Sequence, residues 1–231
     1  LGIEKVAIFV ENTDWGRATG DQLKATFDNY YPEYDLVSVY LIEVGQTDFY
    51  SVLSELKPLD PDFLFISLTG TSAAIITRQI REVGIGAYIC GLSGDFDTDT
   101  YAELCGESLR GVTIAHMFHP DGNAEAGTFY DEYVARWPDK PPGSYAAECY
   151  AGAVVLFEAI ERAGSTDPEA IRTELRKTNR QTVLIKPVKF DPVYQNSPIN
   201  ELFVQWVAIG ERGIIWPEES KTMDPIKGPF A

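Results

Sequence analysis

Cysteine, histidine and methionine are scarce in this sequence. Its 231 residues include three cysteines, two histidines and two methionines. Cys90, Cys105 and Cys149 show no C-x-x-C spacing, which excludes a zinc ribbon and a thioredoxin-like dithiol. Cys90 and Cys105 could pair, but the odd count leaves at least one thiol free. A buried structural thiol is the simpler expectation for each.

Lysine and arginine are also few relative to the acidic residues. The chain has 19 Lys and Arg against 35 Asp and Glu, which gives a formal net charge of −16 at pH 7. Such an excess of negative charge repels polyanions and favours solubility. We therefore expect neither nucleic acid nor an anionic lipid surface as a partner.

Long apolar runs are missing as well, since none approaches the roughly 20 residues that a membrane-spanning helix needs. The chain opens LGIEKVAIFV, without an initiator methionine or the features of a signal peptide, so we expect a mature or truncated chain. A hydrophobic content of 45% is typical of a soluble globular protein. The length allows one large domain or two small ones.

The first half of the sequence alternates apolar strands with amphipathic helices. Thr47 is expected to cap the second helix, and Gly84 to end the third. Strands are expected at 5–10, 35–42, 63–67, 87–91 and 111–116, and helices at 15–29, 47–57, 71–83 and 98–104. Short connections between such units predict an α/β fold with a parallel, doubly wound sheet.

After residue 118 helices dominate. Phe129, Tyr133 and Trp137 mark one, and the Asp167-Pro168 pair starts another. The run at 145–163 is apolar nearly all round, so we expect it to be largely buried. Only residues 181–190 and 202–208 offer strands, so these helices lack most of the sheet they would cover. The change of pattern places a boundary within residues 116–126.

Polar loops follow three of the predicted strands. They read ENTDWG, SLTGTS and GLSGDFDTD. Ligands of open α/β sheets bind outside the carboxyl ends of the strands, so these loops are the candidate site. They contain no histidine, lysine or cysteine and no nucleophile–base pair, which argues against an enzyme. Their composition favours hydrogen bonding to a small polar molecule.

The SLTGTS loop is not a phosphate-binding motif, because it has one glycine and no following lysine. One interpretation is a helix start capped by Thr71 or Ser72, which leaves Ser67 and Thr69 unexplained. Elsewhere on the candidate site, Trp15 is either the wall of a pocket or a first-turn residue folded onto its own domain.

Metal sites are not expected. The acidic run that starts at Asp95 resembles a calcium loop, but Thr100 and Gly106 replace its required glycine and glutamate. Near His116 and His119 the sequence shows neither an evident helix nor an evident carboxylate partner, so we interpret them as hinge residues rather than zinc ligands. Asp95 itself either receives a ligand ammonium or hydroxyl, or caps its own turn. No cofactor is predicted.

Three long segments resemble one known family, the branched-chain amino-acid (Leu/Ile/Val) type of periplasmic solute-binding proteins, the type I receptors of ABC transporters. They are KVAIFVENTDWG, GQTDFYSVLSELKPLDPDFLFIS and SYAAECYAGAVVLFEAIERAGSTDPEAIRTELRKT. The resemblance runs over nearly the whole chain. It implies the type I periplasmic-binding-protein fold, in which two Rossmann-like lobes close on a ligand by hinge motion.

The resemblance also implies a domain organisation. Residues 1–118 correspond to the carboxyl-terminal lobe, 119–198 to a return segment of the amino-terminal lobe, and 199–231 to a crossover back to the carboxyl-terminal lobe. The first part of the amino-terminal lobe is absent from the sequence. We therefore expect a large exposed apolar patch on the helices that it would cover, and hence self-association, partial disorder or pairing with the missing segment.

The resemblance also implies which residues of this sequence stand at the family's ligand-contacting positions. Where amino-acid receptors of this family place an acid for the ammonium, this chain has Ser93, with Asp95 two residues on. The implied ligand-binding residues are Trp15, Ser67, Thr69, Ser93, Asp95 and Tyr145.

The function implied is that of a periplasmic or extracellular receptor, lipid-anchored or free. It would capture an amino acid, amide or related carboxylate and deliver it to the membrane permease of an ABC transporter. The alternative is the sensory domain of a signalling receptor with the same fold. A Rossmann-like enzyme is disfavoured by the loops.

Overall fold

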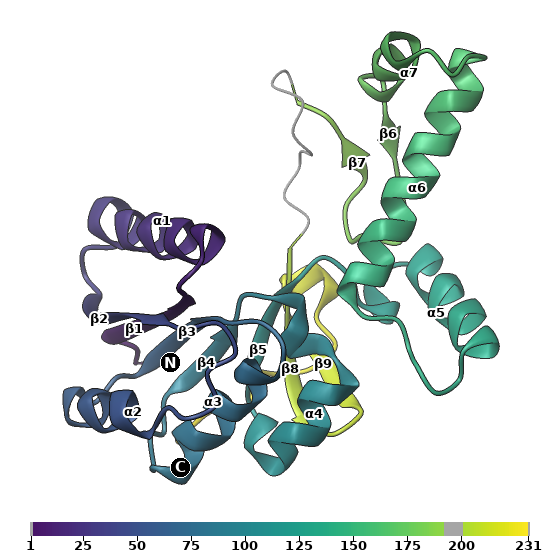
Figure 1. Ribbon diagram of the computed structural model, residues 1–231. Helices are drawn as coiled ribbons and strands as arrows, with labels where there is room; N and C mark the ends of the chain where they lie inside the picture. The colour runs from purple at the N-terminus through teal and green to yellow at the C-terminus, as the bar shows by residue number, and fades with distance from the viewer. Residues whose placement is uncertain (1, 192–200, 231) are drawn as a thin grey trace. The chain divides into compact units, whose positions relative to one another are not determined.

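The computed structural model describes residues 2–191 and 201–230. The chain divides into two compact units (Figure 1). Unit 1 comprises Leu1–Ala115, Phe203–Ile215 and Met223–Ala231, and unit 2 comprises His116–Leu202 and Trp216–Thr222. The lobe assignment made from the sequence stays a prediction, and its residues 192–198 lie outside the described part of the chain.

Unit 1 is built around a seven-stranded sheet with the order β2-β1-β3-β4-β5-β8-β9. β1 runs parallel to β2 and β3, and the pairs β3–β4 and β4–β5 are parallel too. The strands are β1 (Lys5–Glu11), β2 (Asp35–Ile42), β3 (Phe63–Ser67), β4 (Tyr88–Gly91), β5 (Thr113–His116), β8 (Leu202–Ala208) and β9 (Glu211–Trp216). The predicted α/β class is confirmed.

Helices cover both faces of this sheet. They are α1 (Asp14–Tyr30), α2 (Tyr50–Leu56), α3 (Thr71–Glu82) and α4 (Asp99–Cys105). Figure 1 shows α1 on one face and α2, α3 and α4 on the other. Because both faces are covered, β1 is a continuous apolar run in which Ile8 and Phe9 have no exposed surface. Burying each such side chain stabilises the fold by about 1.5–3 kcal/mol.

The predicted cap of α2 is wrong. The helix begins after Phe49, whose side chain makes no capping hydrogen bond. Instead the buried Gln79 of α3 accepts a hydrogen bond from the Phe49 amide (2.7 Å) and donates one to the Thr47 carbonyl (3.0 Å). The Gln79 side chain, from the neighbouring helix, thus bonds the backbone at the start of α2, and Thr47 takes part through its carbonyl rather than its hydroxyl. Gly84, by contrast, has the expected left-handed backbone after α3 (φ 74°).

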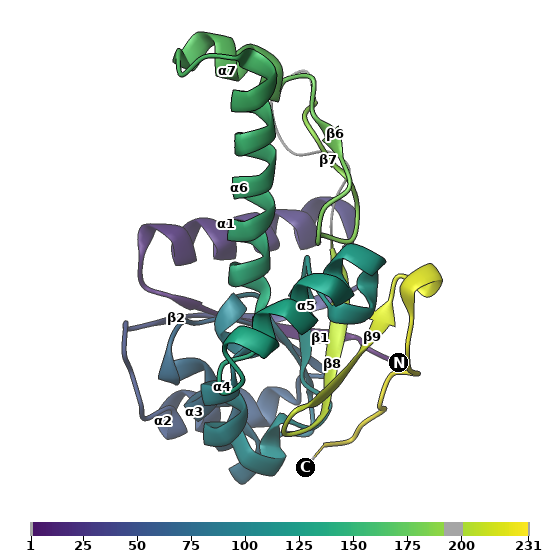
Figure 2. The ribbon, with the colours of Figure 1, turned by 90° about the vertical axis from the view of Figure 1, so that its right-hand side faces the viewer.

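Among its described residues, unit 2 contains three α-helices and a small antiparallel sheet. These are α5 (Ala124–Arg136), α6 (Ser144–Ala163), α7 (Pro168–Leu175), β6 (Asn179–Arg180) and β7 (Val188–Lys189). Arg180 links β6 to two of the helices, since its guanidinium lies 2.7 Å from Glu125 of α5 and 3.0 Å from Glu158 of α6. Figure 2 shows the β6–β7 pair alongside α6.

The strand predicted at 181–190 is mostly wrong. Only its end is extended, as β7, because the preceding carbonyls bind side chains instead of a partner strand. The Asn123 side chain donates to the carbonyls of Thr182 (3.3 Å) and Leu184 (2.8 Å), and Gln181 donates to the same two oxygens.

The expected burial of α6 is also wrong. Its buried apolar residues follow one i, i+4 row, Ala147, Ala151, Val155 and Ala159. Elsewhere on the helix, large apolar side chains are exposed: Tyr145 (56%), Tyr150 (47%), Leu156 (40%) and Phe157 (66%). Unit 2 therefore covers a single narrow face of α6. Within the described residues, no helix is both long and apolar enough to cross a bilayer.

Candidate ligand-binding rim

Three polar loops lie side by side at one edge of the unit 1 sheet. They follow the carboxyl ends of β1, β3 and β4, which are neighbours in the strand order. We call residues 11–16, 67–72 and 92–97 the rim. Five of the six predicted ligand-binding residues belong to it, whereas Tyr145 is an α6 residue of unit 2.

Trp15 lies in the first turn of α1 and is 47% exposed. The turn before it is tight, because the Thr13 hydroxyl accepts a hydrogen bond from the Gly16 amide (3.0 Å). A Cβ at Gly16 would lie 2.0 Å from the Glu11 carbonyl oxygen, so only glycine fits there. This turn holds the indole at the edge of the sheet with about half of its surface free.

Glu11 organises the rim and was not among the predicted site residues. Its side chain is 4% exposed, and its Oε1 accepts hydrogen bonds from the Thr69 amide (2.8 Å) and hydroxyl (2.6 Å). Hydrogen bonds to a charged group typically contribute about 1.5–3 kcal/mol. The carboxylate therefore ties the first loop to the second, and the Thr69 hydroxyl is engaged within the protein. An acid that ends an otherwise apolar strand was the one signal for this in the sequence.

The second loop starts α3 without a side-chain cap, which corrects the predicted role of Thr71 or Ser72. Gly70 occupies the N-cap position with φ 59°, and the Ser72 hydroxyl donates instead to the Gln46 carbonyl (2.8 Å). The positive end of the α3 dipole thus points out of the rim loop with no side-chain oxygen from its N-cap. Ser67 ends β3 fully buried, and its Oγ has no hydrogen-bond partner among the described residues.

The third loop carries Ser93 and Asp95. Ser93 is buried, and its hydroxyl donates to the Leu68 carbonyl (2.8 Å), which ties this loop to the second one. Asp95 is partly exposed and lies in the short 3₁₀ helix η2 (Gly94–Asp97). Its carbonyl accepts a hydrogen bond from the Thr98 hydroxyl (3.0 Å), while its carboxylate makes no turn-capping bond within the described chain.

Two ionisable groups in the core of unit 1 have strongly shifted pKa values. Burial raises the pKa of the Cys105 thiol to about 12, and raises that of the Tyr101 phenol as well. The Tyr101 hydroxyl lies 3.2 Å from the Thr77 hydroxyl, between α3 and α4. Both groups stay protonated near neutral pH. They are therefore unsuited to act as a base or nucleophile.

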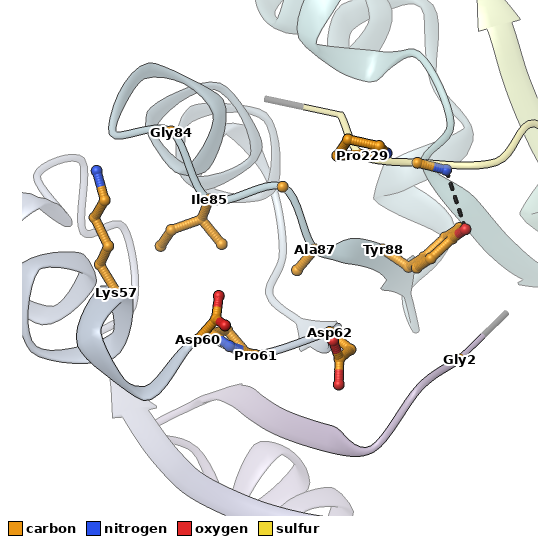
Figure 3. A pocket seen from close by; sticks show the side chains of 12 residues that line it. Gly2, Lys57, Asp60, Pro61, Asp62, Gly84, Ile85, Ala87, Tyr88 and Pro229 are labelled. Carbon is orange, nitrogen blue, oxygen red and sulfur yellow. Dashed lines mark hydrogen bonds between the residues drawn. The ribbon is translucent and has the colours of Figure 1, made fainter.

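A separate hollow of about 510 Å³ lies at the opposite edge of the sheet, where β3 and β4 begin (Figure 3). Three of its polar side chains make hydrogen bonds that close that edge. Lys57 donates to the Val83 carbonyl (2.6 Å), Asp62 accepts the amides of residues 4 and 5 (2.9 and 2.8 Å), and the Tyr88 hydroxyl accepts the Gly228 amide (3.0 Å). The hollow shares no residue with the rim.

Residues 2–191 and 201–230 contain no group of three or more His, Cys, Asp or Glu that could hold a metal ion. His119 is buried and accepts a hydrogen bond from the Asp121 amide at its Nδ1 (3.2 Å). His116 is buried too. Their predicted role in a hinge stays a prediction. None of the three cysteines forms a disulfide, and Cys149 is exposed.

A mostly parallel sheet with polar, hydrogen-bonding loops at the carboxyl ends of its strands is the architecture in which open α/β proteins bind ligands. The chain belongs to the periplasmic binding protein family, whose model matches residues 1–210. This is a family of binding proteins rather than enzymes, so both the predicted resemblance and the expectation of no enzymatic activity are confirmed.

One curated relative and two solved structures illustrate the similarity. The chain is 24% identical to the leucine-, isoleucine-, valine-, threonine- and alanine-binding protein of Pseudomonas aeruginosa over 180 residues, which cover 77% of this chain and 46% of that protein. A leucine-binding protein structure from Thermotoga maritima matches with a TM-score of 0.73 and 26% identity, covering 92% of this chain and 60% of that one. An isoleucine complex from Streptococcus pneumoniae matches with a TM-score of 0.78, 20% identity, and coverage of 93% and 61%. The chain spans about half the length of the curated relatives it matches.

Proposed function

We propose that this chain is part of a solute receptor that captures an amino acid, an amide or a related carboxylate for uptake by an ABC transporter. The observation that carries the proposal is the construction of the rim. Glu11 and Ser93 tie three loops together through buried hydrogen bonds, and Trp15 and Asp95 keep exposed surface beside them. Such a rim binds a solute without transforming it.

Each part of a small zwitterion or amide has a matching group on the rim. The exposed indole of Trp15 offers an apolar wall for a side chain. The Asp95 carboxylate can accept a charge-assisted hydrogen bond from an ammonium or amide N–H. The α3 start, which has no side-chain cap, presents the positive end of its dipole to a carboxylate or carbonyl oxygen. The rim therefore supports ligands with both a donor and an acceptor head group.

The relatives' names support the same ligand class, since they describe proteins that bind leucine, isoleucine, valine, threonine and alanine. We further propose a location in the periplasm or outside the cell, free or lipid-anchored, and the permease of the transporter as the partner. No described feature favours the sensory alternative.

The test is calorimetric titration of the full-length gene product with L-leucine, L-isoleucine, L-alanine, acetamide, urea and benzoate. We expect one chemical class to bind with a Kd near or below about 1 μM, equivalent to about −8 kcal/mol. Ligand-dependent tryptophan fluorescence should vanish in Trp15→Phe and persist in the matched Trp137→Phe variant, whose indole lies in unit 2. A folded full-length protein that binds none of these compounds would contradict the proposal.

A further inference from the structure

The last hairpin of the sheet reaches back to the loop that carries Asp95. From β8, the Trp206 indole N–H donates to the Phe96 carbonyl (2.9 Å). From β9, the Nε of Arg212 lies 2.8 Å from Oδ1 of Asp97. The hairpin is thus attached to both residues that directly follow Asp95.

These two attachments form one buried cluster. Trp206 has no exposed surface, and the side chains of Asp97 and Arg212 are 1% and 18% exposed. The guanidinium carbon of Arg212 also lies 4.9 Å from the centroid of the Trp206 ring, within the range of a cation–π contact. An ion pair shielded from water in this way is stronger than an exposed one. It also neutralises Asp97, which leaves Asp95 as the carboxylate of η2 with exposed surface.

Other bonds also hold this loop: the Ser93 hydroxyl donates to the Leu68 carbonyl, and the Thr98 hydroxyl donates to the carbonyl of Asp95 itself. Within η2 the Phe96 amide donates to the Ser93 carbonyl at 3.2 Å, a long bond for a single turn. The Phe96 ring rests on Gly91, where a Cβ would lie 2.2 Å from the ring, so the contact depends on glycine. The contacts of Trp206 with Phe96 and of Arg212 with Asp97 add to these bonds in fixing the backbone at Asp95.

We propose that Trp206 and Arg212 are positioning residues that set the orientation of Asp95 at the rim, and thereby the affinity for a ligand with a donor head group. The inference rests on the proposed function, because it assigns Asp95 to the binding of that head group. Neither positioning residue belongs to the rim loops. Each acts through a backbone carbonyl or a buried carboxylate next to Asp95.

The first experiment needs no ligand. Amide hydrogen exchange at residues 95–98 is compared in the full-length protein and in Trp206→Phe and Arg212→Lys, which keep an aromatic ring and a positive charge respectively. We expect exchange at Phe96 to accelerate about tenfold or more in both variants while the β1 amides keep their protection. The matched controls are Trp137→Phe and the exposed Arg110→Gln, which should leave residues 95–98 unchanged.

The second experiment measures affinity for the compound of the calorimetric panel that binds most tightly. We expect Trp206→Phe to weaken binding about tenfold, and Asp95→Asn to cause a much smaller further loss in the Trp206→Phe background than in the wild type. This non-additivity would not arise from a general loss of stability. Unchanged exchange together with additive affinity losses overturns the positioning role. A folded wild type without affinity for any panel compound overturns the proposed function and, with it, the role of positioning for binding.

Discussion

At the scale of single residues, the rim is held by side chains that bind backbone. Glu11 engages the Thr69 amide, Ser93 engages the Leu68 carbonyl, and each bond joins loops that follow different strands. Preorganisation of this kind lowers the entropic cost of binding, since the loops need not be ordered by the ligand. A residue of the rim can therefore matter to binding without contacting the ligand.

Glu11→Gln tests this arrangement. The amide keeps the size of the side chain but replaces two charge-assisted hydrogen bonds with neutral ones, so we expect the free energy of unfolding to fall by about 1–2 kcal/mol. Urea denaturation followed by circular dichroism measures the change. The exposed Glu107→Gln, in the same unit, is the control and should shift the free energy by less than about 0.5 kcal/mol. Equal effects of the two substitutions would argue against the role of Glu11.

Asp95→Asn tests the ligand contact. Loss of a charge-assisted hydrogen bond costs about 1.5–3 kcal/mol, which is roughly a ten- to hundredfold loss of affinity. We expect that loss in calorimetric titrations of the full-length protein, with little change in melting temperature because the Asp95 carboxylate supports no bond within the described chain. Asp60→Asn, at the hollow on the opposite edge, is the matched control. Intact affinity in Asp95→Asn would remove Asp95 from the site.

The sequence predicted which loops form the rim but not how they are held. Polar residues after apolar strands point to the carboxyl edge of a sheet, and that rule identified the loops of Trp15, Ser67 and Asp95. The bonds from Glu11 to Thr69 and from Arg212 to Asp97 join residues far apart in the chain. Such pairs depend on the three-dimensional arrangement, which periodicity and spacing do not contain.

At the scale of elements, the packing of α3 against α4 predicts a pH dependence. Burial raises the pKa of Cys105 from 9.0 to about 12, so the folded protein favours the neutral thiol. Below about pH 9 the thiol is neutral in both the folded and the unfolded state, so its contribution to the free energy of unfolding is fully present. Above pH 9 the unfolded thiol ionises first, so the contribution is lost as the pH rises toward 12, by about 1.4 kcal/mol per pH unit.

The window between pH 9 and 10 isolates this effect. Tyr101, whose pKa is raised above 10.0, also lowers the free energy of unfolding as the pH rises, but only above pH 10. Arg81, whose pKa is lowered to about 10, acts with the opposite sign there. Urea denaturation at pH 8, 9 and 10 should show a drop above pH 9 in the wild type and a shallower one in Cys105→Ala. The exposed Cys149→Ala should keep the wild-type slope, and identical slopes in all three proteins would contradict the prediction.

Helices and strands could be predicted from the hydrophobic pattern where the elements that they pack against belong to this chain. The predicted strands at 35–42 and 63–67 match β2 and β3, because each lies in a sheet that the chain itself completes. The burial of α6 could not be predicted from its composition, since an apolar helix is buried only if the structure covers all its faces. β9 was missed because its ERGIIW segment is short and follows a glycine turn at Gly210 (φ 76°).

At the scale of the whole molecule, the exposed side chains of α6 predict self-association. Tyr150, Leu156 and Phe157 lie outside the buried row of this helix, and the chain has about half the length of its curated relatives. Contiguous apolar surface of this kind drives association in water. We expect the 231-residue chain, expressed alone, to form dimers or larger species in size-exclusion chromatography with light scattering.

A substitution on α6 sharpens this prediction. Phe157→Lys should shift the distribution toward monomer, because Phe157 is 66% exposed and a charge there opposes burial in an interface. Leu59→Lys, an exposed apolar position of unit 1, is the control and should leave the distribution unchanged. A monodisperse wild-type monomer with well-protected α6 amides would contradict the prediction.

The discontinuity of unit 1 has a consequence for synthesis on the ribosome. The chain leaves this unit after Ala115 and returns at Phe203, so β8 joins the sheet only after all of residues 116–202 have been made. Until then β5 pairs with β4 alone, and its other edge is open to wrong pairing in the nascent chain. The Asp95 loop also stays without Trp206 and Arg212 during that interval. A nascent chain therefore acquires a finished rim only after β9 has been made.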